Sequence, residues 1–149
     1  STKVLHPYVQ ALLENPKPQV GVYYTSLTAD DATAIAQNEK LKDAEEVILK
    51  KCYLKEATSI IASNTTWKNL HTLDLYKNYC EDKGAEAIGR NVTWKNLKKL
   101  DLHSNLIGDQ GAEAIGSNVT WVDLEVLDLQ KNLIGDSGAA AIGRNTTWK

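Results

Sequence analysis

The sequence predicts an α/β solenoid, a curved stack of repeated units with parallel strands on the concave face and short helices on the convex face. Three observations predict it. Tryptophan and asparagine recur at intervals of 27 residues. Each interval contains a segment of alternating leucines, typical of a strand, and an alanine-rich segment with helical spacing. A unit of this size cannot bury its own apolar face, so neighbouring units must stack.

The repeat is clearest between residues 91–117 and 118–144, which are identical at 18 of 27 positions. Their shared frame is N-V-T-W-x-x-L-x-x-L-D-L-x-x-N-L-I-G-D-x-G-A-x-A-I-G. The frame extends upstream with fewer matches and with one residue deleted near Lys55. The sequence therefore predicts five units and a truncated sixth, at about 20–37, 38–63, 64–90, 91–117, 118–144 and from 145.

Each unit should contain a strand at L-x-x-L-x-L and a helix after it, such as the one expected from Asp109 to Gly116. Asp109 is predicted to cap this helix by accepting from its free backbone N–H groups, and Asp82 and Asp136 occupy the same place in their units. Gly111 is small enough to let the helix lie close to its neighbour.

Residues 1–19 do not fit the repeat frame. They contain apolar residues that would share one helical face, and Asn15, Pro16 and Pro18 should end that helix. We expect an N-terminal helical cap that shields the open edge of the first strand. Its apolar residues are Leu5, Tyr8, Val9, Leu12 and Leu13.

Charge and composition argue against several classes of protein. The formal net charge of -2 does not favour a nucleic-acid-binding protein, and no apolar run reaches the length of a membrane span. No signal-peptide pattern opens the chain. Two cysteines, Cys52 and Cys80, are too few for a disulfide framework. We therefore expect a protein of a reducing compartment, the cytoplasm.

Four N-x-[ST] motifs begin at Asn64, Asn91, Asn118 and Asn145. We interpret them as a structural corner. Asn91 follows a helical segment and would adopt the left-handed conformation that ends helices, while the threonine hydroxyl would bond nearby backbone. The tryptophan would stack on its equivalents in adjacent units. The alternative is that these motifs are glycan acceptors of a secreted protein.

The motif L-x-x-L-x-L-x-x-N-x-I followed by G-D-x-G-A-x-A-I resembles the ribonuclease-inhibitor-like class of leucine-rich repeats. The resemblance covers residues 20–149 and implies a horseshoe. It also implies that Asn78, Asn105 and Asn132 form a ladder, with their side-chain amides bonding backbone groups in the turns after the strands. Cys52 and Thr25 replace asparagine in the first two units.

One short motif suggests catalysis. Cys80 and Asp82 resemble the C-x-D motif of bacterial leucine-rich-repeat ubiquitin ligases, in which the cysteine is the nucleophile. The repeat frame argues against this role, because Cys80 takes the place of the core residue Ile107. The three histidines share no spacing with other ligands that suggests a metal site. We therefore predict no catalytic residue, no metal site and no cofactor.

The residues between the strand leucines should point out of the concave sheet, because side chains alternate across a strand. Asp74, Asp101 and Asp128 would then form an acidic column. The column either awaits a basic partner or stays solvated. The predicted partner-binding residues are Tyr23, Ile48, Lys50, Asp74, Tyr76, Lys99, Asp101, His103, Asp128 and Gln130.

We predict a module that binds another protein on its concave face, as an inhibitor or adaptor. Its near-identical repeats also resemble those of effectors of intracellular bacteria, which would place it in a host cytosol. The alternative is the substrate-recognition arm of a larger enzyme, such as a leucine-rich-repeat ubiquitin ligase. A small-ligand sensor is the least supported class. An uncapped C-terminal edge could pair with a second copy.

Overall fold

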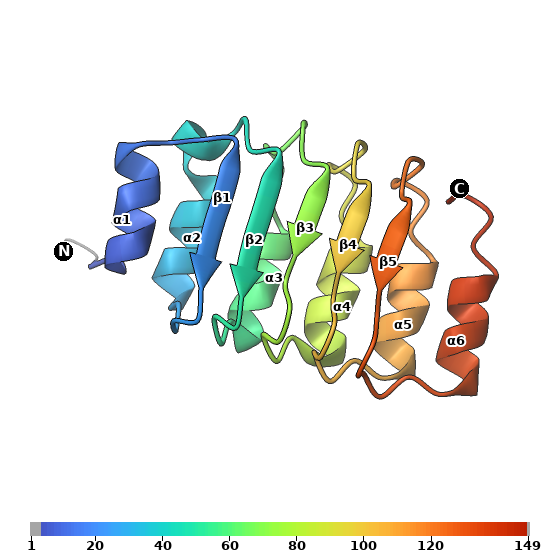
Figure 1. Ribbon diagram of the computed structural model, residues 1–149. Helices are drawn as coiled ribbons and strands as arrows, with labels where there is room; N and C mark the ends of the chain where they lie inside the picture. The colour runs from blue at the N-terminus through green and yellow to red at the C-terminus, as the bar shows by residue number, and fades with distance from the viewer. Residues whose placement is uncertain (1–3, 149) are drawn as a thin grey trace.

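Five parallel strands form one sheet, and helices line its back in the computed structural model (Figure 1). The structure describes residues 4–148. The strands follow one another in chain order, as β1 (Gln19–Tyr23), β2 (Glu46–Lys50), β3 (Thr72–Asp74), β4 (Lys99–Asp101) and β5 (Val126–Asp128). The helices are α1 (Pro7–Glu14), α2 (Ala29–Gln37), α3 (Thr58–Ala62), α4 (Glu81–Gly89), α5 (Asp109–Gly116) and α6 (Asp136–Gly143), with short 3₁₀ helices η1 (Glu39–Leu41) and η2 (Lys55–Ala57).

The strand register follows the repeat frame. Leu73 pairs with Leu100, and Leu100 pairs with Leu127. Leu73 and Leu100 are fully buried between the sheet and the helices. Because side chains alternate, the residues between these leucines point to the open face of the sheet. The predicted α/β architecture is thus observed, with no helix of the described residues long and apolar enough to cross a membrane.

The N-terminal helix α1 ends at Glu14, before Asn15, as its sequence predicts. Val9 lies in the core. Tyr8, however, is 57% exposed, so its place on the buried face of this helix was predicted wrongly. Its ring lies against His6 instead, with the ring centroids 4.9 Å apart. Residues 1–3 of the predicted cap and Lys149 of the predicted sixth unit lie outside the described residues.

Buried Asp31 joins the N-terminal segment to α2. Its Oδ1 accepts from the backbone N–H of His6 at 2.7 Å, and its Oδ2 accepts from the backbone N–H of Thr28 at 2.9 Å. The Thr28 hydroxyl in turn accepts from the Asp31 N–H, which completes a capping box at the start of α2. The hydrogen bonds explain how a carboxylate is accommodated at a position that is 2% exposed.

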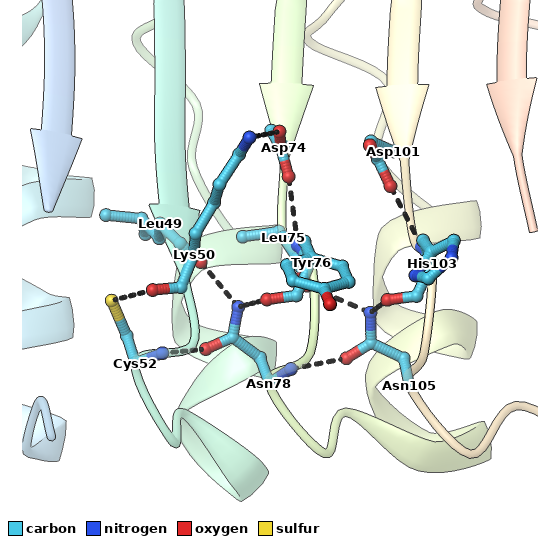
Figure 2. A network of polar contacts seen from close by, with 10 residues as sticks. All are labelled: Leu49, Lys50, Cys52, Asp74, Leu75, Tyr76, Asn78, Asp101, His103 and Asn105. Carbon is cyan, nitrogen blue, oxygen red and sulfur yellow. Dashed lines mark hydrogen bonds and ion pairs between the residues drawn. The ribbon is translucent and has the colours of Figure 1, made fainter. Parts of the chain in front are cut away.

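An asparagine ladder runs along the edge where the strands end (Figure 2). Asn105 Oδ1 accepts from the backbone N–H groups of Asn78 and Cys80, while its Nδ2 donates to the carbonyls of Leu75 and His103. Asn78 and Asn132 bond their neighbours in the same way. Each amide therefore satisfies turn backbone of its own and the preceding unit, as the resemblance implied.

Cys52 takes the asparagine place in the ladder, as the repeat frame indicated. Its thiol donates to the carbonyl oxygens of Val22 and Lys50, at 3.3 and 3.4 Å. Its own backbone N–H is held by Asn78 Oδ1. The thiol cannot reproduce both functions of an amide, so the ladder is weaker at this end.

A second asparagine ladder lies at the opposite edge, at the N-x-[ST] motifs. Asn91 Oδ1 accepts from the backbone N–H groups of Thr93 and Trp94, and its Nδ2 donates to the carbonyls of Ala62 and Asn64. The predicted left-handed conformation of Asn91 is wrong, because the left-handed residues of the described chain lie elsewhere. The asparagine amide, which reaches the preceding unit, supplies the bonds expected of the threonine hydroxyl.

The tryptophans stack in two pairs at this second corner. Trp67 and Trp94 are fully buried, with ring centroids 6.3 Å apart and planes 17° apart. Trp121 and Trp148 form a similar pair at 6.4 Å. The four N-x-[ST] motifs are thus one structural corner repeated along the stack.

The helix caps differ from the prediction. Asp109 does not cap its own helix, whose N-cap position is held by Gly108 without a side-chain cap. Instead, Asp109 Oδ1 accepts from the backbone N–H groups of Gly135 and Gly138, at the start of the next helix. Asp82 makes the same pair of bonds to α5. Each of these aspartates lies inside the first turn of its own helix instead of before it. Its side chain therefore faces the neighbouring unit.

The junction between α3 and α4 is less complete than the later ones. The shorter second unit replaces the first helical turn by η2, and α4 begins at Glu81 with Cys80 at the N-cap position and no side-chain cap. A groove of about 840 Å³ lies between η2–α3 and α4, with Lys55, Tyr79 and Arg90 among its lining residues. The one-residue deletion thus locally loosens the helix layer.

Candidate concave binding face

The outward side chains form rows across the sheet. The register pairs Gln19 with Glu46, and Gly21 with Ile48. It also pairs Ile48 with Asp74, Asp74 with Asp101, and Asp101 with Asp128. All ten predicted binding residues therefore lie on or beside the open face, from Tyr23 on β1 to Gln130 just after β5. Whether a partner binds there stays a prediction.

The three aspartates of the acidic column are partly shielded from solvent and already form bonds within the chain. Each aspartate accepts a backbone hydrogen bond from the residue two positions later, as Asp101 Oδ1 does from the His103 N–H at 2.9 Å. Asp74 is 5% exposed, and its Oδ2 lies 3.4 Å from the Lys50 ammonium. One end of the column is thus neutralised within the chain.

Asp101 occupies the least favourable place in the column. Partial burial raises the pKa of its carboxyl above the ordinary value, and the neighbouring Asp74 and Asp128 charges raise it further. The hydrogen bond from the His103 N–H acts in the opposite direction. The carboxylate is therefore held where a cation would stabilise it. The Asp74 carboxylate conversely raises the pKa of Lys50.

Aromatic rings surround a lysine beside this column. The Lys51 ammonium lies 5.3 Å from the Tyr24 ring centroid and 5.8 Å from that of Tyr76. Tyr76 in turn contacts the His103 ring, at a centroid distance of 5.0 Å. Tyr23 extends the group towards β1, because its ring lies over Gly21 and 6.4 Å from Tyr24. Tyrosines and cations in such contact are favoured in protein interfaces.

Sequence analysis missed Lys51 as part of this face. Strand alternation ends at Lys50, but Lys51 has a left-handed backbone with φ 53°, which redirects its side chain. Its N–H donates to the Tyr76 carbonyl of the next unit at 2.9 Å. Tyr24, Lys77, Ser104 and Lys131 have the same backbone conformation at equivalent places. Only the frame position, directly before Cys52, could have indicated this.

The cysteines lack the properties of a nucleophile. Both are free and buried, and burial raises the pKa of Cys80 to about 12 and that of Cys52 to about 11. A thiol with such a pKa holds almost no thiolate at neutral pH. Cys80 therefore packs in the core, as the repeat frame indicated.

Known proteins resemble this chain in its repeats and in its fold. Residues 95–116 and 123–143 match the family model described as Leucine Rich repeat. Among solved structures, the one of leiomodin-1 actin-binding site 2 is similar with a TM-score of 0.56 and 16% sequence identity. The alignment covers 97% of this chain and 73% of that one. At this identity the similarity is one of fold. No curated protein sequence matches the chain.

Proposed function

We propose that this chain, whose fold is that of a leucine-rich-repeat solenoid, holds a partner protein against its concave sheet. The observation that carries the proposal is the position of Asp101, a half-buried carboxylate between two others and beside the Tyr76–His103 pair. A basic side chain from a partner would relieve the repulsion in the column. The neighbouring rings would supply apolar contact area.

The rigidity of the face supports a binding role. The strands are fixed by the sheet and by the asparagine ladder at their ends, so little of the surface needs to be ordered on binding. That lowers the entropic cost of association. An inhibitor, an adaptor or an effector would use the same face, and the two buried free cysteines suit a reducing compartment such as the cytoplasm.

We also propose that the chain belongs to the ribonuclease-inhibitor-like class of these repeats. The 27-residue unit and the α-helix that follows each of the five strands support this proposal.

The test compares partner capture by the wild-type chain and by a variant carrying Tyr76→Ala, Asp101→Lys and Asp128→Lys. A matched control carries Tyr8→Ala, Glu14→Lys and Glu113→Lys, the same kinds of change at exposed sites on α1 and α5. We expect a protein retained by the wild type and the control to be lost by the concave variant. Equal retention by all three folded proteins would contradict the proposal.

A milder substitution separates charge from folding. Asp101→Asn keeps an oxygen that can accept from the His103 N–H but removes the charge that its neighbours oppose. Stability should stay the same or rise slightly, whereas affinity for the captured partner should fall. Unchanged affinity would mean that the carboxylate takes no part in recognition.

A further inference from the structure

A row of exposed apolar side chains runs along the edge of the stack where the strands end, outside the concave face. The row, here called the apolar ridge, consists of Tyr53, Tyr79, Leu106 and Leu133, exposed by 50%, 37%, 44% and 67%. Each residue directly follows a rung of the first asparagine ladder (Figure 2), so successive units contribute one residue each. The Tyr53 and Tyr79 rings stack, with centroids 5.8 Å apart.

The backbone at the ridge does not favour these residue types. Tyr53, Tyr79 and Leu106 have positive φ angles of 48°, 56° and 59°. Asparagine or glycine adopts this conformation at lower cost than a bulky side chain does. The stacking of the two tyrosines offsets part of that cost. Leu106 has the same backbone cost, but its side chain is 44% exposed and so gains less from burial than a core leucine does. Folding stability alone would therefore favour asparagine at this position.

Lysines flank the ridge on the side of the concave face. Lys51, Lys77 and Lys131 lie two residues before Tyr53, Tyr79 and Leu133, and all three share the left-handed backbone that aligns them. Ion pairs seen among the described residues involve Lys50 and Arg90 but none of these three lysines. The edge thus presents an apolar row beside three lysines without an ion pair among the described residues, with Ser104 at the equivalent place before Leu106.

We propose that the apolar ridge is a docking site for an acidic amphipathic helix of a partner protein. The distance of 5.8 Å between the Tyr53 and Tyr79 ring centroids is close to the rise of about 5.4 Å per helical turn. An extended strand would place its same-side residues about 6.6 Å apart and would lose register along the row. Apolar residues at every third or fourth helix position would meet the ridge, and acidic residues on one flank would meet the lysines.

The charges argue against a second copy of the chain as the occupant. Two copies placed ridge to ridge would bring the same lysine rows close together, and like charges repel. Lys51 borders both this edge and the proposed concave site, but the four ridge residues lie outside the concave site. Substitutions of Tyr79 and Leu106 therefore test this proposal while leaving the concave residues unchanged, so either proposal can fail while the other stands.

The probe is a synthetic helical peptide of about 18 residues with leucine on one face and glutamate on one flank. Its binding is followed by fluorescence anisotropy. The variant carries Tyr79→Asn and Leu106→Asn. The control variant carries Val92→Thr and Val119→Thr at the opposite edge, where these valines are 69% and 71% exposed and where threonine occurs in other units.

The wild type should bind the peptide, and the ridge variant should bind it about tenfold more weakly or worse. The control should stay within about twofold of the wild type. Leu106→Asn alone should leave the melting temperature unchanged or higher, because it relieves backbone strain. Failure of the wild type to bind, or equal binding by the ridge variant, would overturn the proposal. So would equally tight binding of a scrambled peptide, of a peptide with lysine in place of glutamate, or of phosphatidylglycerol vesicles.

Discussion

Asp82 Oδ1 accepts a hydrogen bond from the backbone N–H of Gly111 at 3.0 Å, across 29 residues of sequence and from one helix to the start of the next. Glycine is needed at this place, because a Cβ on residue 111 would lie 2.8 Å from the same oxygen. The bond is one of a pair, the other coming from Gly108 at 2.7 Å. At α5 and α6, helix capping thus couples neighbouring units, whereas α2 is capped by its own Thr28.

Removal of this cap should destabilise the stack. Asp82→Ala leaves two N–H groups at the start of α5 without their acceptor, and we expect a loss of about 1 kcal/mol in the free energy of unfolding. Urea unfolding measures the change. Asp136→Ala is the matched control, since Asp136 occupies the same frame position and no later helix follows it among the described residues. If both variants lost the same free energy of unfolding, the bonds from Asp82 to α5 would contribute nothing. The loss would then come only from removing a negative charge in the first turn of the helix that carries each aspartate.

Stability should also depend on pH through Asp109. The hydrogen bond from the Gly135 N–H is the main cause that lowers the pKa of its carboxyl, and the bond from Gly138 contributes. A carboxyl with a lowered pKa in the folded state stabilises it above the unfolded pKa of about 3.9. This contribution is lost as the pH falls through the folded-state pKa. The free energy of unfolding of the wild type, relative to Asp109→Asn, should therefore decrease below about pH 4. A difference that stays constant down to pH 2 would contradict the assignment.

The first asparagine ladder should be less tolerant of substitution. Asn105 is fully buried and makes hydrogen bonds through both ends of its amide, so Asn105→Ala leaves buried backbone groups unsatisfied. We expect a loss of about 3 kcal/mol or more in the free energy of unfolding. Asn96→Ala, at an exposed asparagine that donates to the Lys68 carbonyl, should cost less than about 0.5 kcal/mol.

If Asn105→Ala does not fold, Asn105→Cys keeps the test available, because Cys52 holds the same place in the second unit. Its loss should lie between those of the other two variants. If Asn105→Ala lowered the free energy of unfolding by less than Asn96→Ala does, the structural role of Asn105 would be refuted.

The N-x-[ST] motifs should remain unglycosylated in the folded protein. Asn64, Asn91 and Asn118 are at most 6% exposed, and the Nδ2 atom that would carry a glycan donates to carbonyls of the preceding unit. Asn145 makes similar bonds but is only half-buried. After secretory expression, the intact mass should show no attached glycan. If a glycan is attached, Asn145 should be the first of the four asparagines to carry one. A glycan on Asn91 in a natively folded chain would contradict this account.

The parts of the structure that follow from local periodicity could be predicted from the sequence. Leu100, Asp101 and Leu102 alternate, so their directions follow from the strand itself. The partner of Asp109 could not be predicted, because it depends on the offset between two helices that are adjacent only in space. Asn91 was assigned to a left-handed turn for a related reason: its local preference was visible, but its bonds to the preceding unit were not.

The same limit applies to the binding surfaces. The rows of concave side chains followed from the register of one repeat on the next. The contacts of Lys51 with Tyr24 and Tyr76 depend on a left-handed residue that is held by a hydrogen bond to the next unit. Lysine has no strong preference for that conformation, so its residue type gave no signal.

The shortened second unit has a mechanical consequence. α5 and α6 are each held to the preceding helix by a carboxylate, whereas α4 is not, and the groove between η2–α3 and α4 opens the helix layer at that place. The sheet and the asparagine ladder remain continuous there. The opening is therefore confined to the helical side, where α4 has fewer bonds to the preceding unit than α5 and α6 have. A partner on the concave face would meet an unbroken sheet across this place, because the gap lies behind it.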